Sequence, residues 1–201
     1  NIALQDNGQT STADLHLEAN ESAFIVFSNE QETGLTDYSP TERETLLTID
    51  TPWKVDFQKG MRGPDETYVM TELQTWDKNE DERIRYFSGT ATYTNTFKLK
   101  KQPDQPVWID LGRVMVMARV YVNNQYAGGV WTSPYRLNIQ HLLHKGTNTL
   151  RVEVVNNWQN RLIGDQKLPE NERPTWTSVN PWRADSPLQE SGLVGPVRLL
   201  Q

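Results

Sequence analysis

Tryptophan is the residue type in this sequence that most clearly suggests chemistry, because four of its seven copies fall in or beside expected loops. These four are Trp131, Trp158, Trp176 and Trp182. A flat indole face packs against the apolar C–H face of a sugar ring, while neighbouring Asn, Arg and Asp side chains reach the hydroxyl groups. The pattern is therefore typical of carbohydrate binding. The structural alternative is that each tryptophan plugs one end of a β-sandwich.

One of these tryptophans lies in an unusual segment, "VVNNWQNRLIGDQKLPENERPTW" (154–176). A strand pattern runs directly into it, and it holds Trp158, Arg161 and Asp165 around the apolar pair Leu162-Ile163. A plain surface loop needs none of these residues. The segment is therefore expected either to pack beneath another part of the protein or to contact a ligand.

Metal sites have weaker signals. His141 and His144 in "HLLH" lack both a nearby third ligand and the glutamate of an HExxH motif. The stretch "DKNED" (77–81) begins like a calcium loop, but its sixth position is Glu82 rather than glycine and its twelfth is Ser88 rather than glutamate. We therefore expect turn histidines, a solvated acidic loop, no metal ion and no cofactor.

Catalytic residues are equally hard to assign. No serine lies on a GxSxG elbow. A glycosidase requires two carboxyl groups roughly 5–10 Å apart, and the 26 acidic residues allow many pairs that the sequence does not distinguish. We therefore name no catalytic residue.

The charge of the chain argues against two classes of partner. The formal net charge is −6 and the pI is near 5.1, whereas a nucleic acid or an anionic membrane selects a basic face. No apolar run approaches the roughly 20 residues that span a bilayer. We therefore expect neither nucleic-acid binding nor membrane insertion.

The elements that position these residues are expected to be short β-strands. In "VMVMARVYV" (114–122) and "TLRVEVV" (149–155), alternation places apolar residues on one face of a sheet. These residues are Val114, Val116, Ala118, Val120 and Val122 in the first strand and Leu150, Val152 and Val154 in the second. Further candidates are "AFIVF" (23–27), "TLLTI" (45–49), "WKVDF" (53–57), "RIRYF" (83–87), "TATYTNTFKL" (90–99), "VWIDL" (107–111), "YRLNI" (135–139) and "PVRLL" (196–200).

The connections between these strands have turn chemistry. Asn123-Asn124 fits a tight hairpin, because asparagine tolerates positive φ better than most residues. About ten short strands with Gly, Pro and Asn between them predict an all-β sandwich or jelly roll. The polar stretch 28–44 is expected to be a linker, so that residues 1–44 form a strand segment with its linker and residues 45–201 form the main domain.

Four stretches together resemble a known family: "IRYFSGTATYTNTFKL", "IDLGRVMVMARVYVNNQYAGGVWTSPYRLNI", "LLHKGTNTLRVEVVNNWQNRLIGD" and "ESGLVGPVRLL". Their order and spacing over residues 50–201 resemble the sugar-binding-like β-sandwich of family 2 glycoside hydrolases. They resemble still more closely the C-terminal module of family 106 α-L-rhamnosidases. One departure is Asn123-Asn124, where members of the family usually carry Asn-Gly; it alters a turn and not a site.

The resemblance implies an all-β, galactose-binding-like jelly-roll β-sandwich with a short N-terminal extension. It also implies a non-catalytic accessory module whose partner is the catalytic domain of the same full-length enzyme, acting on a plant-type or other polysaccharide in the bacterial periplasm or outside the cell. Because the sequence begins with Asn1 rather than Met, we expect a processed protein or a piece of a longer one.

The resemblance also offers a role for the unusual segment, since "NNWQNRLIGD" marks the exit from a core strand in the family. We expect a packed loop that Arg161 and Asp165 brace through charge-assisted hydrogen bonds. The competing hypotheses are sugar contact by Trp131, Trp158, Arg161 and Trp182, and docking of the segment onto the catalytic domain. Two other functions stay open: an autonomous carbohydrate-binding module, and a self-sufficient hydrolase with two carboxylates facing each other across a deep cleft.

Overall fold

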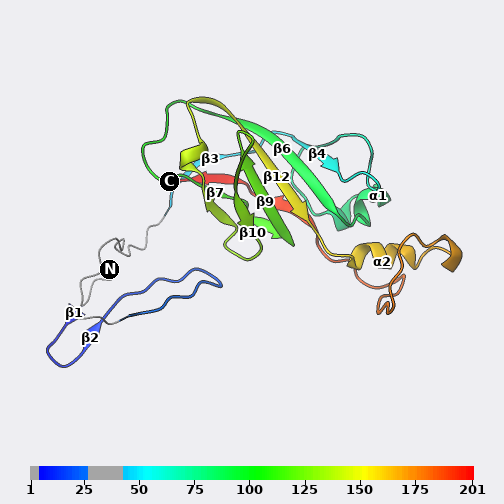
Figure 1. The fold of residues 1–201 in the computed structure, drawn as a ribbon, viewed down its shortest axis with the longest axis horizontal. Helices are drawn as coiled ribbons and strands as arrows, with labels where there is room; N and C mark the ends of the chain where they lie inside the picture. Colours follow the sequence, from blue (N-terminus) through cyan, green and yellow to red (C-terminus); the bar gives the residue numbers. More distant parts are fainter. Residues whose placement is uncertain (1–4, 27–42) are drawn as a thin grey trace. The chain divides into compact units, whose positions relative to one another are not determined.

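The computed structural model describes residues 5–26 and 43–201, which belong to two compact units, Asn1–Glu44 and Thr45–Gln201 (Figure 1). In the first unit, β1 (Gln5–Asp6) and β2 (Ser11–Thr12) form an antiparallel hairpin. Residues 23–26 have no regular secondary structure, so the strand predicted at "AFIVF" is wrong for them. Phe27 and residues 28–42 of the expected linker lie outside the described residues.

The second unit contains a six-stranded antiparallel sheet in the order β10-β9-β12-β6-β4-β5. The two longest strands, β6 and β12, pair along ten residues at the centre of this sheet. The six strands are β4 (Trp53–Phe57), β5 (Tyr68–Met70), β6 (Thr90–Leu99), β9 (Met117–Val122), β10 (Gln125–Val130) and β12 (Gly146–Val155).

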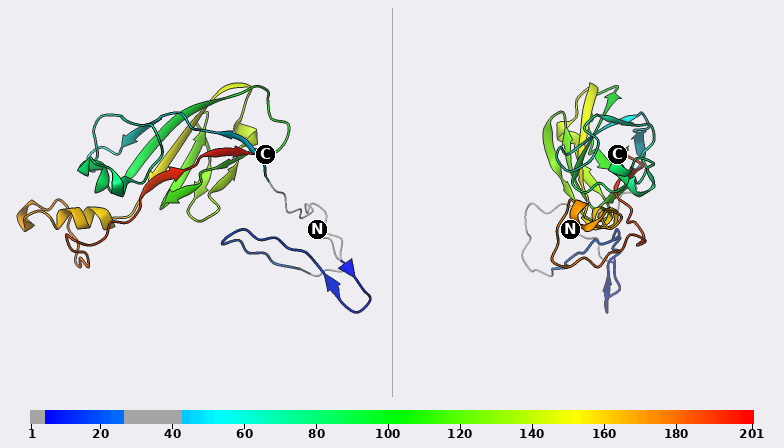
Figure 2. Two further views of the ribbon diagram at one scale, coloured as in Figure 1. Left: turned by 180° about the vertical axis from the view of Figure 1, so that it is seen from behind. Right: turned by 90° about the vertical axis from the view of Figure 1, so that its right-hand side faces the viewer.

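A second sheet of four strands, in the order β11-β7-β14-β3, forms the other layer, and a short pair joins β13 to β8 (Figure 2). These strands are β3 (Thr45–Thr48), β7 (Trp108–Asp110), β8 (Arg113–Met115), β11 (Arg136–Asn138), β13 (Gly192–Gly195) and β14 (Arg198–Leu200). The predicted all-β sandwich is therefore confirmed.

Apolar residues from both sheets meet in one core, as the alternation predicted. Ile109 and Leu199 contribute from the four-stranded sheet. The five residues predicted to face a common core, Val120, Val122, Leu150, Val152 and Val154, are all fully buried. Their register prediction is confirmed, because a slip of one residue would have turned every one of them to solvent.

The strand predicted over residues 114–122 is interrupted at Val116. β8 pairs with β13, whereas β9 lies between β10 and β12 in the large sheet, so the chain changes partners at this point. Val116 is 38% exposed, while Val114 is fully buried. The prediction that Val116 shares the buried face is therefore wrong, because period-two alternation holds only while a strand keeps one sheet.

The strand predicted at "RIRYF" is also wrong, since Glu82–Arg85 forms the helix α1. The Asp81 carboxylate accepts a hydrogen bond from the backbone N–H of Arg83 at 2.9 Å, which caps the first turn. Ile84 and Phe87 are both fully buried, and a spacing of three places them on one helical face.

The hairpin predicted at Asn123-Asn124 joins β9 to β10, and both residues have positive φ, 52° and 65°. The Asn123 side chain also accepts a bond from Thr149 N–H at 2.9 Å and donates to Leu142 C=O at 2.9 Å. This asparagine therefore fixes the turn against the neighbouring strand, which glycine cannot do.

The other helical elements are short: η1 (Trp76–Lys78), η2 (Gln140–Leu142), α2 (Gln159–Asp165) and η3 (Glu170–Glu172). In Figures 1 and 2, α2 and the segment after it project from one end of the sandwich. Within residues 5–26 and 43–201, no helix combines the length and hydropathy needed to cross a membrane.

A buried polar contact joins η1, β6 and β13 inside the core. The Tyr93 hydroxyl accepts hydrogen bonds from Trp76 Nε1–H at 2.6 Å and from Leu193 N–H at 3.2 Å. Burial raises the pKa of Tyr93, because a phenolate would lose its hydration there. Gly192 has φ of +99° and lies so close to Trp76 that a Cβ would stand 2.5 Å from Nε1, so this position requires glycine.

Candidate functional site

The unusual segment leaves β12 through a polar junction rather than a free loop. The Asn156 side chain accepts from Gly89 N–H at 3.0 Å and donates to Phe87 C=O at 2.8 Å. The Ser88 hydroxyl donates to Asn157 C=O at 2.9 Å. These bonds tie the exit of β12 to the residues that precede β6.

Residues 159–165 form α2 rather than the packed loop that was expected, so that detail of the prediction is wrong. Ile163 is 1% exposed and fills the buried side of the helix. A Cβ at Gly164 would lie 2.7 Å from Cγ of Tyr86, so only glycine allows the helix to approach this ring. The apolar pair Leu162-Ile163 is therefore explained by helix packing.

Sequence analysis did not identify Asn160, although it clamps the returning chain. Its side-chain amide donates to Gln189 C=O at 2.7 Å and accepts from Gln189 N–H at 2.8 Å. Asn160 is 2% exposed. Its position in a polar run gave no signal of this role, because a partner 29 residues away is visible only in the folded chain.

Arg161 and Asp165 form an ion pair along α2, with Nη1 3.9 Å from Oδ1 and side chains that are 12% and 3% exposed. That distance is longer than a hydrogen bond. Asp165 Oδ2 instead accepts from the backbone N–H of Thr175 at 3.2 Å and from its hydroxyl.

The Arg161 guanidinium of this pair is largely buried, and its pKa is lowered as a result. Burial lowers the pKa of Arg161, the Asp165 carboxylate opposes that change, and Arg62 adds to it. Asp165 Oδ1 and Arg161 Nη2 are both buried without a hydrogen-bond partner among the described residues. Asp165 therefore links α2 to Thr175 in the returning chain, while Asp165 Oδ1 and Arg161 Nη2 retain unused hydrogen-bonding capacity.

The predicted sugar-contacting tryptophans are exposed to different degrees. Trp131 is 71% exposed, Trp158 is 50% exposed and Trp182 is partly buried. None of the ring–ring contacts in the described part of the chain involves any of the three. Trp176, also considered from sequence, is 88% exposed.

The register brings two of these tryptophans to the same end of the large sheet. β10 and β12 both run antiparallel to β9, and Val130 and Val154 both pair with Ala118, so the two strands finish at the same end of the sheet. Trp131 follows the last residue of β10, and Trp158 is three residues beyond the last residue of β12. Trp182 lies in the long segment after η3, away from both strand ends in the chain.

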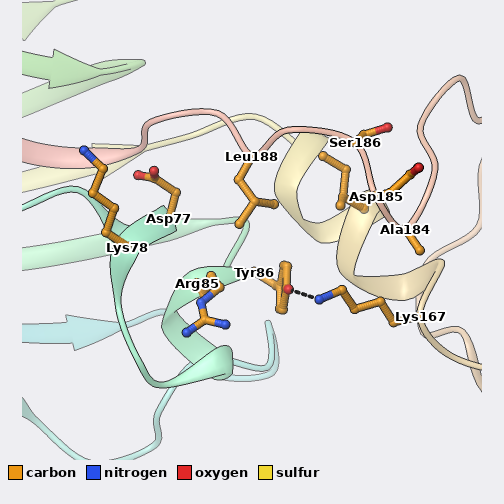
Figure 3. A pocket seen from close by; sticks show the side chains of 10 residues that line it. Asp77, Lys78, Arg85, Tyr86, Lys167, Ala184, Asp185, Ser186 and Leu188 are labelled. Atoms are coloured by element: carbon orange, nitrogen blue, oxygen red, sulfur yellow. Dashed lines mark hydrogen bonds between the residues drawn. The ribbon is translucent and has the colours of Figure 1, made fainter.

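A pocket of about 510 Å³ lies beside α2 (Figure 3). Its lining residues come from three segments that are distant in sequence, 77–86, 163–167 and 184–188. It combines charged, hydroxyl and apolar side chains. The lining residues are Asp77 and Lys78 from η1, Arg85 and Tyr86 from the α1 end, Ile163 and Lys167 from the α2 end, and Ala184, Asp185, Ser186 and Leu188 from the returning chain. Such a volume lies within the range of small-molecule sites.

The metal-site motifs that seemed weak from sequence have other uses. Asn79 and Asp81 accept backbone bonds at the start of α1, from Asp81 N–H at 3.0 Å and Arg83 N–H at 2.9 Å. His144 Nδ1 lies 2.9 Å from Lys145 C=O. In the part of the chain that the structure describes, no three His, Cys, Asp or Glu side chains are grouped to hold a metal ion.

Comparison with known proteins places this geometry in context. A family model described as "Glycosyl hydrolase 2 galactose-binding domain-like" matches residues 68–187. A "Putative beta-glucuronidase" from Formosa agariphila is 36% identical, with 64% of this chain and 13% of that protein covered.

Solved structures give the same picture. A rhamnosidase from Novosphingobium sp. PP1Y matches with a TM-score of 0.86 and 38% identity, over 99% of this chain and 19% of that one. A β-glucuronidase from Ruminococcus gnavus in complex with D-glucuronic acid has a TM-score of 0.57 at 18% identity, over 83% of this chain and 30% of that one, and shows the fold alone. The chain thus spans less than a third of each of these relatives.

Proposed function

Because the chain belongs to the galactose-binding-like domains of family 2 glycoside hydrolases, we propose that it is a non-catalytic accessory domain of a larger, α-L-rhamnosidase-like polysaccharide-degrading enzyme. In that role it supports or extends the substrate cleft of the catalytic domain. The enzyme would act in the periplasm or outside the cell, since polysaccharides are too large to enter one.

One observation carries this proposal: nearly the whole chain resembles about a fifth of a rhamnosidase, at 38% identity. A part of that size, built as a β-sandwich, leaves most of the relative for other functions. The fraction of the rhamnosidase that this chain covers does not by itself define an activity, because one fold serves many functions. The proposal therefore rests on the family and on this partial match to a rhamnosidase.

A second candidate function is sugar binding by the isolated domain, and the exposure of Trp131 and Trp158 at one end of the large sheet favours it. Two indole faces at the same end of the sheet offer stacking surfaces for a sugar chain. In the accessory role the same surface borders the substrate of the catalytic domain.

The accessory role is tested by measuring hydrolysis of aryl rhamnosides, galactosides and glucuronides by the purified chain. We expect no turnover above buffer. Asp77→Asn and Asp185→Asn serve as matched variants, because both carboxylates line the pocket beside α2. Turnover that survives repurification and disappears in either variant would make the chain a self-sufficient hydrolase and overturn the proposal.

A further inference from the structure

The pocket beside α2 has three hydrogen-bond donors on one side. In Figure 3 the Arg85 guanidinium, the Tyr86 hydroxyl and the Lys167 ammonium group lie along that side. Lys167 Nζ donates to the Tyr86 hydroxyl oxygen at 2.5 Å and lies 5.0 Å from the centre of its ring. A donor cluster of this kind attracts a negatively charged group.

Much of the hydrogen-bonding capacity of these donors is unused. Lys167 has three N–H groups and donates one of them to Tyr86, and in residues 5–26 and 43–201 it takes part in no ion pair. Tyr86 is 7% exposed, and its own O–H has no acceptor among the described residues. Because Tyr86 lines the pocket, its hydroxyl hydrogen is available to an acceptor that enters there.

Arg85 is held in place while keeping donors free. Its Nε donates to Asn79 C=O at 2.8 Å and its Nη2 to Glu80 C=O at 3.3 Å. The nearest carboxylate contact is to Glu82, with Nη1 at 3.9 Å and that glutamate 68% exposed. The guanidinium is therefore oriented by backbone carbonyls, and its charge is only weakly compensated.

The opposite side of the pocket has the complementary chemistry. Asp185 and Ser186 line the other side of the pocket, with Leu188 between them and Asp77, and in Figure 3 the oxygens of Asp185 and Ser186 point away from the donors. Carboxylate and hydroxyl oxygens accept hydrogen bonds from sugar hydroxyls, and Leu188 offers an apolar surface to a ring. A free inorganic anion would satisfy the donors but would leave the side of the pocket at Asp185, Ser186 and Leu188 without a partner.

A ligand that fits both sides has one anionic group and several hydroxyl groups. We propose that this pocket is a binding subsite for an acidic saccharide, whose carboxylate contacts Arg85, Tyr86 and Lys167 and whose hydroxyls face Asp185 and Ser186. The inference rests on the proposed function, and it names the class of sugar that the accessory domain holds. The volume of the pocket is large enough for one acidic sugar unit and the sugar unit linked to it.

The test is a calorimetric titration of the whole chain with matched glycosides. The probes are methyl β-D-glucuronide and methyl α-D-galacturonide, compared with methyl β-D-glucoside and methyl α-D-galactoside, which carry CH2OH in place of the carboxylate. Sodium acetate is the probe for a bare carboxylate. We expect at least one uronide to bind roughly ten-fold more tightly than its neutral partner and than acetate.

Two variants locate the binding. Tyr86→Phe removes the hydroxyl but keeps the ring against Gly164, and Lys167→Met removes the ammonium group from an exposed side chain. Each should weaken uronide binding roughly ten-fold. Lys98→Met, on the exposed face of β6, is the matched control and should leave binding unchanged.

Three results would overturn the subsite: no uronide binding, equal binding of the neutral glycosides or acetate, or uronide binding that neither variant weakens. None of these three results contradicts the accessory role, because the hydrolysis assay tests that role separately. Conversely, turnover in that assay would defeat the accessory role even if the uronides bind as expected.

Discussion

Replacing Asp165 with Asn tests whether the Arg161–Asp165 pair holds α2 in place. The Asp165 side chain is 3% exposed, and its Oδ1 lies 3.9 Å from Arg161 Nη1. The asparagine keeps a side-chain oxygen that can accept from Thr175, so the main change is loss of the negative charge. Arg161 then remains buried without its opposite charge.

The magnitude follows from the distance and the burial. Two unit charges about 4 Å apart interact by roughly 4 kcal/mol at an effective dielectric constant near 20. Part of that loss is offset, because the buried asparagine no longer pays the desolvation of a carboxylate. We therefore expect a net destabilisation of roughly 2 kcal/mol, or a drop in Tm of roughly 4–8 °C for a domain of this size.

The assay is thermal unfolding of the whole chain followed by circular dichroism at neutral pH. Asp104→Asn is a matched control: Lys101 Nζ lies 3.6 Å from Asp104 Oδ1, but these side chains are 76% and 72% exposed. The control should lose less than about 0.5 kcal/mol, because water screens an exposed pair. Arg161→Met, alone and combined with Asp165→Asn, completes a double-mutant cycle that isolates the coupling.

The bracing role is refuted if Asp165→Asn melts at the same temperature as Asp104→Asn. It also fails if the double-mutant cycle is additive, because two interacting charges must show coupling. A stable Asp165→Asn protein that loses oligosaccharide affinity would assign Arg161 and Asp165 to ligand contact instead.

Three further variants test the fold. Val152→Ala should cost roughly 1–3 kcal/mol in chemical denaturation, since Val152 is fully buried between two sheets, and an unchanged midpoint would contradict this packing. Tyr93→Phe should cost roughly 2–4 kcal/mol, because Trp76 Nε1–H and Leu193 N–H lose their acceptor. Because burial raises the pKa of Tyr93, the wild type should lose stability above about pH 10, where an unfolded tyrosine ionises, and this part of the pH slope should be absent in the variant. Trp131→Ala should leave Tm within about 1 °C, since its side chain is 71% exposed, and a larger drop would show a structural role.

The parts of the fold that could be predicted are those whose signal is local. The alternation in "WKVDF" and "TATYTNTFKL" coincides with β4 and β6, residue for residue. Asn123-Asn124 forms the predicted hairpin, because positive φ is a property of the residue itself. These elements lie in one continuous sheet, so a period of two persists along them.

The failures occur where a longer-range contact decides between local alternatives. Ile84 and Tyr86 alternate as in a strand, yet the Asp81 cap and the burial of Phe87 select a helix. Val116 continues an apolar alternation, but the chain leaves one sheet partner for another there. Neither outcome is encoded within a window of five to nine residues.

The candidate site depended still more on tertiary contacts. The sequence pointed to Trp158, Arg161 and Asp165, and all three lie on or next to α2. It did not point to Tyr86 or Lys167, because a phenol and a lysine 81 positions apart become neighbours only when α2 packs against the end of α1.

By itself, then, the sequence determined strands such as β4, β6 and β12, the core faces of β9 and β12, and the tight turn at Asn123-Asn124. These properties follow from side-chain periodicity and from the conformational preference of single residues. The tertiary structure alone decided that Val116 is exposed and that Arg161 is buried beside Asp165. It also decided that Arg85, Tyr86 and Lys167 share a pocket. The physical reason is that burial and proximity belong to the packed chain, in which residues far apart in sequence exclude water from one another.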